Sequence, residues 1–298
     1  MTPPRVRKAI FPAAGLGTRF LPVTKAQPKE MLPLVDKPTI QYGVEEAIAS
    51  GIEEVIMVTG GGKRAIVDHF DRSRELEHYL TERGKTDMLR ILAEVDDLTN
   101  RVDITYIQQK EPLGLGHAVW TARRLVEDDE ACAVLLADDV ILGDGDPCLK
   151  QLIDAHRETG ATVIAVRRFP RDQIGRFGVV ATKRSNGRIH EVTDMVEKPK
   201  PGTEPSDLAI LGRYVLTPAV FAALDRVEPG AGKEIQLTDA IKGSLGSHPV
   251  VAYEFEGDYY DTGTVAGYLR ANLMLAMKRE GLREEIAPIL RELLDNST

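Results

Sequence analysis

Two kinds of hydrophobic pattern alternate along the first half of the chain. Short runs rich in β-branched residues are typical of buried strands, and stretches with apolar residues three and four positions apart are typical of amphipathic helices. Alternating strands and helices predict an α/β fold, with a mainly parallel sheet and helices on both faces. Strands are expected at residues 6–11, 54–59, 103–108, 131–137 and 161–167, and helices at 39–50, 63–80, 116–127 and 147–159.

The pattern changes after Arg168. Further strand-like runs, separated by turns and one or two helices, indicate a mixed half of the sheet with a hairpin-like elaboration. The chain is expected to be helical from about residue 265, with a break near Gly281 and Pro288. No Pro-, Gly- or Ser-rich stretch is long enough to be a hinge, so residues 1–298 are expected to form one domain. The further strands are expected at 178–182, 189–197, 208–216 and 250–255.

Residues 69–99 are highly charged and are expected to form two helices inserted between strands. A solvated helical face is the simplest interpretation, and an oligomer contact or a lid is the alternative. Near the C-terminus, Leu269, Leu273, Ala276 and Met277 recur at helical spacing. This face favours a homodimer or homotetramer, although the same residues could pack against the chain's own core.

Composition narrows the classes of function. The formal net charge is −8, which argues against broad nucleic-acid binding. No apolar run approaches the roughly 20 residues of a membrane span, so no membrane association is expected. The basic N-terminus lacks the apolar stretch of a secretory signal, and two cysteines, Cys132 and Cys148, suggest no disulfide framework. These features fit the cytoplasm. A polyanionic substrate would need a local cluster of cations.

Such a cluster follows the first predicted strand. The segment Phe11-Pro-Ala-Ala-Gly-Leu-Gly-Thr-Arg19 contains two alanines and two glycines, which let backbone N–H groups approach an anion closely. Phe20 stands where a dinucleotide fingerprint would have its last glycine, and the hydroxyl and guanidinium of Thr18 and Arg19 suit a triphosphate better. A basic, proline-rich loop, residues 25–38, comes next.

Acidic residues mark a second candidate site. Asp138 and Asp139 end the predicted strand at residues 131–137, and ligands of open α/β sheets bind beyond the carboxyl ends of strands. An aspartate at this place can hold Mg²⁺ while substrate phosphates supply further oxygens. A role in capping or turn formation is the alternative, and it weighs more for Asp139 than for Asp138.

Together these motifs resemble the signature of the sugar nucleotidyltransferase family. A-A-G-x-G-T-R from Ala13, P-K-E-M-L-P from Pro28 and D-K-P from Asp36 match in order, and Thr24-Lys25-Ala26 is similar to the glucose-1-phosphate uridylyltransferase branch. The resemblance implies a Rossmann-like nucleotidyltransferase fold and the transfer of the uridylyl group of UTP to glucose 1-phosphate. A thymidylyltransferase using dTTP and a non-catalytic sugar-nucleotide-binding paralogue stay open as alternatives.

The resemblance also implies roles for single residues. The pattern Q-x-x-x-x-G-x-G-H-A begins at Gln109, and a glutamine amide offers the donor and the acceptor that the uracil edge requires. His117, in this pattern, is interpreted more simply as a helix-start residue, and Thr262, after Asp261, could likewise have the structural role of capping the helix that follows. The nucleotide site would comprise Ala13, Ala14, Gly15, Gly17, Thr18, Arg19, Lys29, Gln109 and Gly114, and the sugar site Gly178, Glu197, Lys198 and Gly212, with Asp138 and Asp261 holding Mg²⁺.

The charges of the substrates suggest the mechanism. Both are anionic, so Mg²⁺, Arg19 and Lys29 would cancel their repulsion while Lys198 aligns the sugar phosphate for direct in-line displacement. The sugar phosphate is already ionised at neutral pH, so no general base is expected. Competing motifs fail: His248-Pro249 is preceded by Ser247 and does not complete a His-Pro-His pattern, and Arg64 and Glu234 follow Gly-Lys pairs where a phosphate-binding loop needs serine or threonine.

Overall fold

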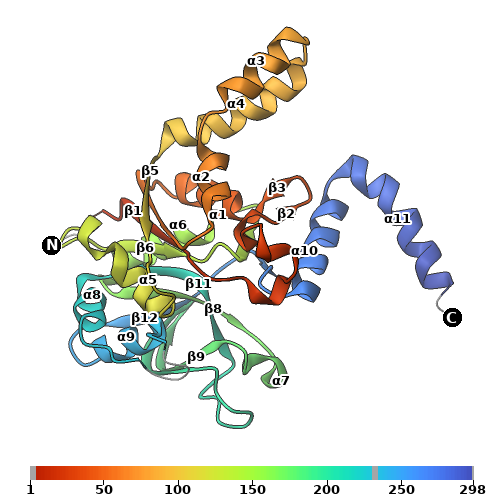
Figure 1. Cartoon of the computed structure of the whole chain (residues 1–298). Coiled ribbons are helices and arrows are strands. Elements are labelled where there is room, and N and C mark those ends of the chain that lie inside the picture. Colours follow the sequence, from red (N-terminus) through yellow and green to blue (C-terminus); the bar gives the residue numbers. More distant parts are fainter. Residues whose placement is uncertain (1–4, 230–233, 297–298) are drawn as a thin grey trace.

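A mixed β-sheet forms the centre of the molecule (Figure 1). The computed structural model describes residues 5–229 and 234–296, and these contain a nine-stranded sheet with the order β5-β4-β1-β6-β11-β8-β12-β10-β9. Its pairs β5–β4, β4–β1, β1–β6 and β8–β12 are parallel and the others are antiparallel, as the change of pattern after Arg168 predicts. The strands are β1 (Lys8–Ala13), β4 (Glu54–Thr59), β5 (Asp103–Gln108), β6 (Cys132–Leu135), β8 (Thr162–Arg168), β9 (Gly178–Asn186), β10 (Ile189–Glu197), β11 (Leu208–Leu216) and β12 (Val250–Glu254).

Helices cover both faces of this sheet because successive strand residues point to opposite sides. Phe11 and Met57 belong to one buried cluster, whereas their neighbours Ile10 and Ile56 belong to the other. The first cluster is completed by α1 (Thr39–Ala49), α2 (Arg64–Phe70), α6 (Cys148–Thr159) and the end of α4 (Thr86–Arg101), and the second by α5 (Leu115–Thr121), α8 (Pro218–Leu224) and α9 (Leu237–Ser244). The expected α/β fold with helices on both faces is confirmed.

The charged segment between β4 and β5 forms a helical hairpin that projects from the body (Figure 1). It consists of α3 (Arg74–Glu82) and most of α4. The expected single helix over residues 63–80 is wrong, because the chain is extended at Asp71 between α2 and α3. Phe70 stays buried in the core, whereas Arg72 turns to the new helix and donates two hydrogen bonds to Glu77. The helix expected over 116–127 is also shorter, since residues 122–125 form a 3₁₀ turn, η4 (Ala122–Leu125).

Short elements arrange the loops at the carboxyl ends of the parallel strands. The ribbon of β7 (Asp139–Leu142) and β13 (Asp258–Asp261) places Asp139 opposite Asp261. The chain after β1 turns through 3₁₀ helices and ends in a small hairpin that packs on the helix of residues 265–278. These elements are η1 (Thr18–Phe20), η2 (Val23–Lys25), η3 (Lys29–Met31), β2 (Pro33–Leu34) and β3 (Lys37–Pro38); α7 (Arg171–Ile174) precedes β9.

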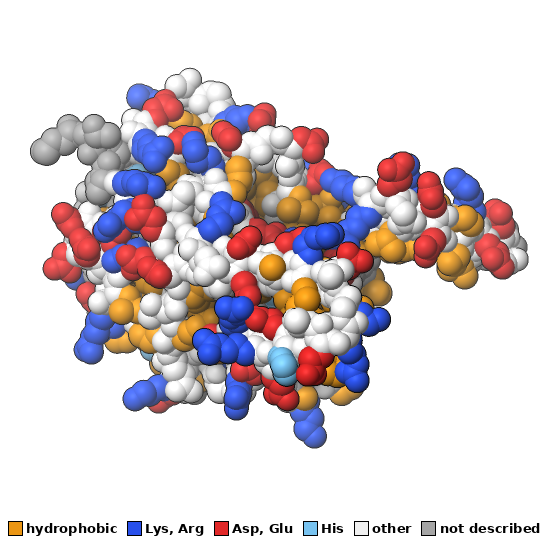
Figure 2. Space-filling view, turned by 90° about the horizontal axis from the view of Figure 1, so that it is seen from above, with side chains coloured by type: hydrophobic (Ala, Val, Ile, Leu, Met, Phe, Trp, Pro, Cys, Tyr) orange, Lys and Arg blue, Asp and Glu red, His pale blue; other side chains and the backbone are white. Residues whose placement is uncertain are grey.

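The C-terminal segment forms two helices, α10 (Val265–Lys278) and α11 (Glu280–Asp295). They separate at Arg279, whose guanidinium binds both carboxylate oxygens of Asp36 at 2.6 Å. The break expected at Pro288 is wrong, because Pro288 lies inside α11. No residue of α11 is buried, and the helix projects as an arm at the right of Figure 1 and Figure 2. In the part of the chain that the structure describes, no helix has the length and apolar character to span a bilayer.

A buried ion pair joins α1 to the centre of the sheet. Arg213, on β11, is 1% exposed and binds Glu46 Oε2 through Nε and Nη2 at 2.9 and 2.8 Å. Its guanidinium also donates to the carbonyl oxygens of Leu136 and Asp139 at 3.0 and 2.7 Å. Glu46 Oε1 accepts from the N–H of Leu149 at 2.9 Å. The pair is therefore saturated with hydrogen bonds and determines the path of residues 136–139.

We expect Arg213→Met to lower the free energy of unfolding by about 3 to 5 kcal/mol, because it leaves the Glu46 carboxylate buried without a counter-ion. The measurement is urea unfolding followed by circular dichroism. Arg64→Met is the matched control, since Arg64 pairs with Asp68 on the surface and its loss should leave the unfolding midpoint nearly unchanged. Equal midpoints for both variants would contradict the structural role of Arg213.

Candidate active site

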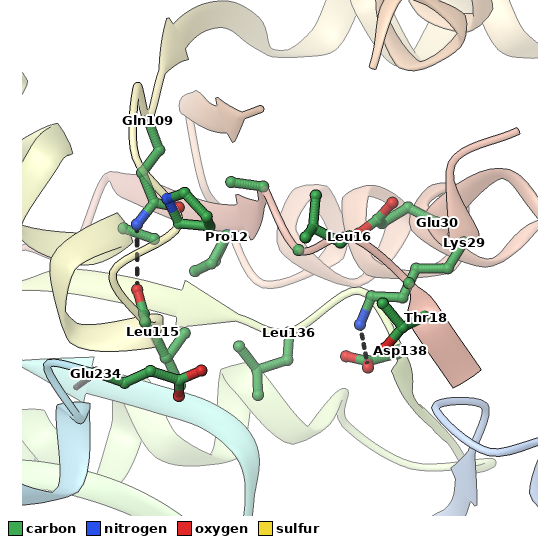
Figure 3. A pocket seen from close by; sticks show the side chains of 16 residues that line it. Pro12, Leu16, Thr18, Lys29, Glu30, Gln109, Leu115, Leu136, Asp138 and Glu234 are labelled. Atoms are coloured by element: carbon green, nitrogen blue, oxygen red, sulfur yellow. Dashed lines mark hydrogen bonds and ion pairs between the residues drawn. The ribbon is translucent and has the colours of Figure 1, made fainter. Parts of the chain in front are cut away.

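A cavity of about 480 Å³ opens at the carboxyl ends of β1, β5 and β6 (Figure 3). The glycine-rich loop after β1 lines one side and residues 109–118 line another, while Leu136 and Asp138 follow β6. Two of the expected nucleotide-site residues, Ala13 and Arg19, do not line this cavity. The side chain of Ala13 is buried in the core, and Arg19 is hydrogen-bonded to Gly263. The cavity brings together Ala14, Gly15, Gly17, Thr18, Lys29, Gln109, Gly114 and Asp138.

Gln109 lies at one end of the cavity and has a fixed amide. Its Nε2 atom donates to the carbonyl oxygen of Gly114 at 3.2 Å and is 2.8 Å from Nδ1 of His117. Since these two contacts use both amide hydrogens, Oε1 is the atom that Gln109 offers to a ligand. His117 also stacks on Trp120, which supports its reading as a structural residue of α5.

Gly114 allows the backbone to pass close to a neighbouring loop. Its φ is 104°, and a Cβ atom there would lie 2.8 Å from the carbonyl oxygen of Ile235. Any side chain would therefore displace one wall of the cavity next to Gln109.

Lys29 and Asp138 form an ion pair at the other end of the cavity (Figure 3). Lys29 Nζ is 2.5 Å from Asp138 Oδ2. Burial alone would lower the pKa of Lys29, but the carboxylates of Asp138 and Glu30 raise it above its usual range. Burial opposes ionisation of Asp138, but the Lys29 ammonium outweighs this effect and lowers the pKa of Asp138. Both groups are therefore charged at neutral pH.

The two carboxylates expected to hold a metal converge on Gly263. A Cβ atom added to Gly263 would lie 3.0 Å from Asp138 Oδ2, 3.3 Å from Asp261 Oδ1 and 3.7 Å from Nη1 of Arg19. Arg19 donates to the carbonyl oxygen of Gly263 at 3.2 Å. Among residues 5–229 and 234–296, no cluster of three or more His, Cys, Asp or Glu side chains could hold a metal alone. Two carboxylates leave places for substrate oxygens, as the hard cation Mg²⁺ requires.

The contacts of Asp139 are structural. They fit a role in holding the turn better than a role as a metal ligand. Its carboxylate accepts from the Tyr259 hydroxyl at 2.6 Å and from the N–H of Gly212 at 3.0 Å. A side chain at Gly212 would collide with Asp139 and Leu136. Burial and the charge of Asp138 raise the pKa of Asp139 to about 6.

The expected sugar-site residues Gly178, Glu197, Lys198 and Gly212 lie outside this cavity, on β9, β10 and β11 or directly after β10. Gly178 pairs with Glu197 across the antiparallel strands. Thr238, on α9, donates to Glu197 Oε2 at 2.8 Å and fixes that carboxylate. The sequence gives no sign of this role for Thr238, because no motif marks a single threonine on a helix.

Lys198 has an unusual backbone. Its φ is 47°, a conformation that residues other than glycine rarely adopt, and its N–H is held by the carbonyl oxygen of Phe177 at 3.1 Å. Its side chain is 59% exposed, and Nζ lies 3.5 Å from Glu197 Oε1. The ammonium is thus free to reach an anion beside Glu197.

Two further features were not apparent from the sequence. Thr262 does not cap α10; Thr264 does, accepting from the N–H of Gly267 at 3.2 Å. Thr262 instead donates to the carbonyl oxygen of Asp138. The second feature is a buried ion pair of 2.7 Å between Lys63 and Glu30, and Glu30 lines the cavity. Both contacts join residues that are distant in sequence, so no local pattern predicts them.

Comparison with known proteins shows the family of this chain. The family model described as nucleotidyl transferase matches residues 8–278, and the chain belongs to that family. Within the family it is similar to the enzymes named UTP–glucose-1-phosphate uridylyltransferase. It is 52% identical over 291 residues to the one from Bacillus subtilis, covering 98% of each chain, and 50% identical over 289 residues to one from Staphylococcus haemolyticus, covering 97% of this chain and 99% of the relative.

Solved structures show the same relationship. A UDP-glucose pyrophosphorylase complexed with UDP-glucose has a TM-score of 0.85 and 39% identity, over 92% of this chain and 100% of that chain. The UTP-bound enzyme from Acinetobacter baumannii has a TM-score of 0.87 and 37% identity, over 97% of this chain and 99% of that chain. The resemblance inferred from the motifs, and the nucleotidyltransferase fold that it implied, are confirmed.

We expect the carboxyl group of Asp139 to titrate at about pH 6, well above the value of about 3.9 for an exposed aspartate. Because the folded pKa is raised, the contribution of Asp139 to stability falls as the pH rises from about 4 to about 6 and is constant above that. Carbon-13 NMR of labelled aspartates measures the titration. Asp138→Asn removes the neighbouring charge and should lower the pKa of Asp139. Titration in the range of an exposed aspartate would contradict this assignment.

Proposed function

We propose that this protein transfers the uridylyl group of UTP to glucose 1-phosphate and releases pyrophosphate. The observation that carries the proposal is the meeting of Lys29, Asp138 and Asp261 at one end of a cavity whose other end holds Gln109. This arrangement would place the base of a nucleotide beside Gln109 and its phosphates beside a metal held by Asp138 and Asp261. The relatives' names, and the UTP and UDP-glucose bound to their solved structures, support the same substrates.

The base would bind between Gln109 and the loop of Gly114. Oε1 of Gln109 accepts the N3–H of uracil, since its amide hydrogens are already engaged. Backbone groups of the glycine-rich loop, residues 13–18, and the side chains of Arg19 and Lys29 would bind the triphosphate. These cations overcome the net charge of −8 locally.

Asp138 and Asp261 would hold Mg²⁺, because their carboxylates converge beside Gly263 without completing a metal site by themselves. Bound there, Mg²⁺ would supply positive charge to the phosphoryl oxygens. Lys29 contacts Asp138 in this structure and would turn to the phosphates when the nucleotide binds.

The reaction is a direct displacement in this proposal. An oxygen of the sugar phosphate attacks the α-phosphorus of UTP, a new P–O bond forms, and the bond from the α-phosphorus to the bridging oxygen breaks as pyrophosphate leaves. Glu197, Gly178 and Gly212 would bind the sugar, and Lys198 would orient its phosphate. Catalysis then comes from alignment and charge stabilisation, and no proton transfer is needed.

Two wider expectations belong to the proposal. The chain acts as a single nucleotidyltransferase domain, supported by the continuity of one sheet through both halves. It acts in the cytoplasm, supported by two free, buried thiols, Cys132 and Cys148.

The test is pyrophosphate release across a matrix of nucleoside triphosphates and sugar 1-phosphates. We expect UTP with glucose 1-phosphate to give the highest kcat/KM, and Asp138→Asn and Asp261→Asn each to lose most activity, because each removes a full charge from a hard-cation site. Lys278→Met serves as control, since Lys278 pairs with Asp258 on the surface. A tenfold preference for dTTP would assign the thymidylyltransferase reaction, and absence of turnover with all pairs would indicate a binding paralogue.

We also propose that the protein is a homodimer or homotetramer. Leu269, Leu273 and Met274 on α10 are 57, 44 and 45% exposed, and Leu293 and Leu294 on α11 are 59 and 72% exposed. Ala276, expected on the same face, is instead buried against the chain's own core. Figure 2 shows apolar side chains along the projecting arm. A second copy that covers these side chains would remove them from water.

We expect light scattering at micromolar concentration to give the mass of a dimer or tetramer, and Leu273→Glu with Leu293→Glu to reduce it, because charges would be buried at the contact. Met88→Glu, at an exposed position on α4, is the control for the other projecting segment. A monomeric wild-type protein would contradict the proposal, and a change caused only by Met88→Glu would move the contact to the α3–α4 hairpin.

A further inference from the structure

Thr262 connects the two loops that carry Asp138 and Asp261. Its N–H donates to the carbonyl oxygen of Asp138 at 2.9 Å, and its hydroxyl donates to the same oxygen at 2.8 Å. Thr262 is 4% exposed and follows Asp261 directly. Two residues separated by 124 positions are therefore held together by a pair of hydrogen bonds beneath the carboxylates.

Other hydrogen bonds hold the remaining parts of these two loops. Arg213 binds the carbonyl oxygens of Leu136 and Asp139, which flank the turn that carries Asp138. On the facing loop, Asp261 Oδ1 accepts from the N–H of Gly263 at 2.9 Å. The β7–β13 ribbon already pairs Asp139 with Asp261. The link from Thr262 continues this pairing to Asp138, and it is the last hydrogen-bonded contact before the two carboxylates.

A hydroxyl adds a constraint that the N–H alone lacks. The carbonyl oxygen of Asp138 has two lone pairs, and Thr262 fills both from two atoms of one residue. With one hydrogen bond, the loop could tilt about the axis of that bond, whereas two hydrogen bonds fix the direction of the loop. The branched Cβ of threonine also restricts χ1, so the hydroxyl is held in place.

We propose that Thr262 is a positioning residue that sets the separation of the Asp138 and Asp261 carboxylates, and thereby the affinity of the site for a divalent cation. This inference rests on the proposed metal site. Thr262 itself would contact neither the substrate nor the metal. It acts through the backbone of Asp138, as groups behind metal ligands commonly do.

The test compares Thr262→Val, which keeps the shape and removes the donor, with Thr262→Ser, which keeps the donor. Mn²⁺ binding to the protein saturated with UDP-glucose is followed by loss of the free-ion EPR signal, with UDP-glucose alone as the blank, because the two carboxylates need ligand oxygens to complete the site. We expect Thr262→Val to weaken Mn²⁺ binding by about 10- to 100-fold, and Thr262→Ser to stay close to wild type. The Mg²⁺ concentration for half-maximal turnover should rise in the same order, with kcat largely recovered at saturating Mg²⁺.

Thr264→Val is the matched control. It lies two residues further along and removes the N-terminal cap of α10, but Thr264 makes no hydrogen bond to Asp138. We expect a lower melting temperature with unchanged Mn²⁺ affinity. This result separates the loss of stability from the loss of carboxylate positioning.

The outcomes distinguish this inference from the proposed function. Equal Mn²⁺ affinities for wild type and folded Thr262→Val would overturn the role of Thr262, and so would equal weakening by Thr262→Ser and Thr262→Val, since the hydroxyl would then not matter. Wild-type protein that turns over UTP and glucose 1-phosphate but takes up no Mn²⁺ would overturn the inference and leave the reaction standing. Absence of turnover with every substrate pair would overturn the proposed function instead.

Discussion

The buried ion pair of Glu46 and Arg213 supports the arrangement on which the candidate site depends. It joins α1, β11 and the loop after β6, three segments from different parts of the chain. A guanidinium has five N–H donors in a rigid plane, so one side chain can bind a carboxylate and several carbonyl oxygens together. Because the charges lie in the interior, each must keep its partners. This requirement fixes the loop of Asp138 more firmly than apolar packing would.

The cationic side chains at the candidate site also have partners close by. The chain has a net charge of −8, yet Lys29 and Arg19 gather where polyanionic phosphates would bind. In this structure each is held by an oxygen of the opposite wall, Asp138 Oδ2 for Lys29 and the carbonyl of Gly263 for Arg19. The charge of Lys29 is thus neutralised by a carboxylate, whereas Arg19 is hydrogen-bonded to a neutral carbonyl. Both side chains can exchange these partners for phosphate oxygens.

The two carboxylates of the candidate metal site come from the two strands of one ribbon. Asp138 directly precedes β7 and Asp261 ends β13, so the pairing of β7 with β13 brings the two carboxylates to the same end of the ribbon. Asp139 takes no part in the convergence on Gly263. Its carboxylate is occupied by Tyr259 and Gly212, so two adjacent acids have different roles because their partners differ.

The sequence by itself determined the sheet strands, the helices on both faces and the motifs at the candidate site, because period and loop composition are local properties of the chain. Strands β4, β5, β10 and β11 have the expected bounds.

The tertiary structure alone decided which polar residues meet. Thr262 bonds to Asp138 rather than capping α10, α2 ends at Phe70, and α11 continues through Pro288. Glu46 with Arg213 and Glu30 with Lys63 likewise pair across long separations. Such contacts depend on how distant segments pack, and no pattern within either segment contains that information.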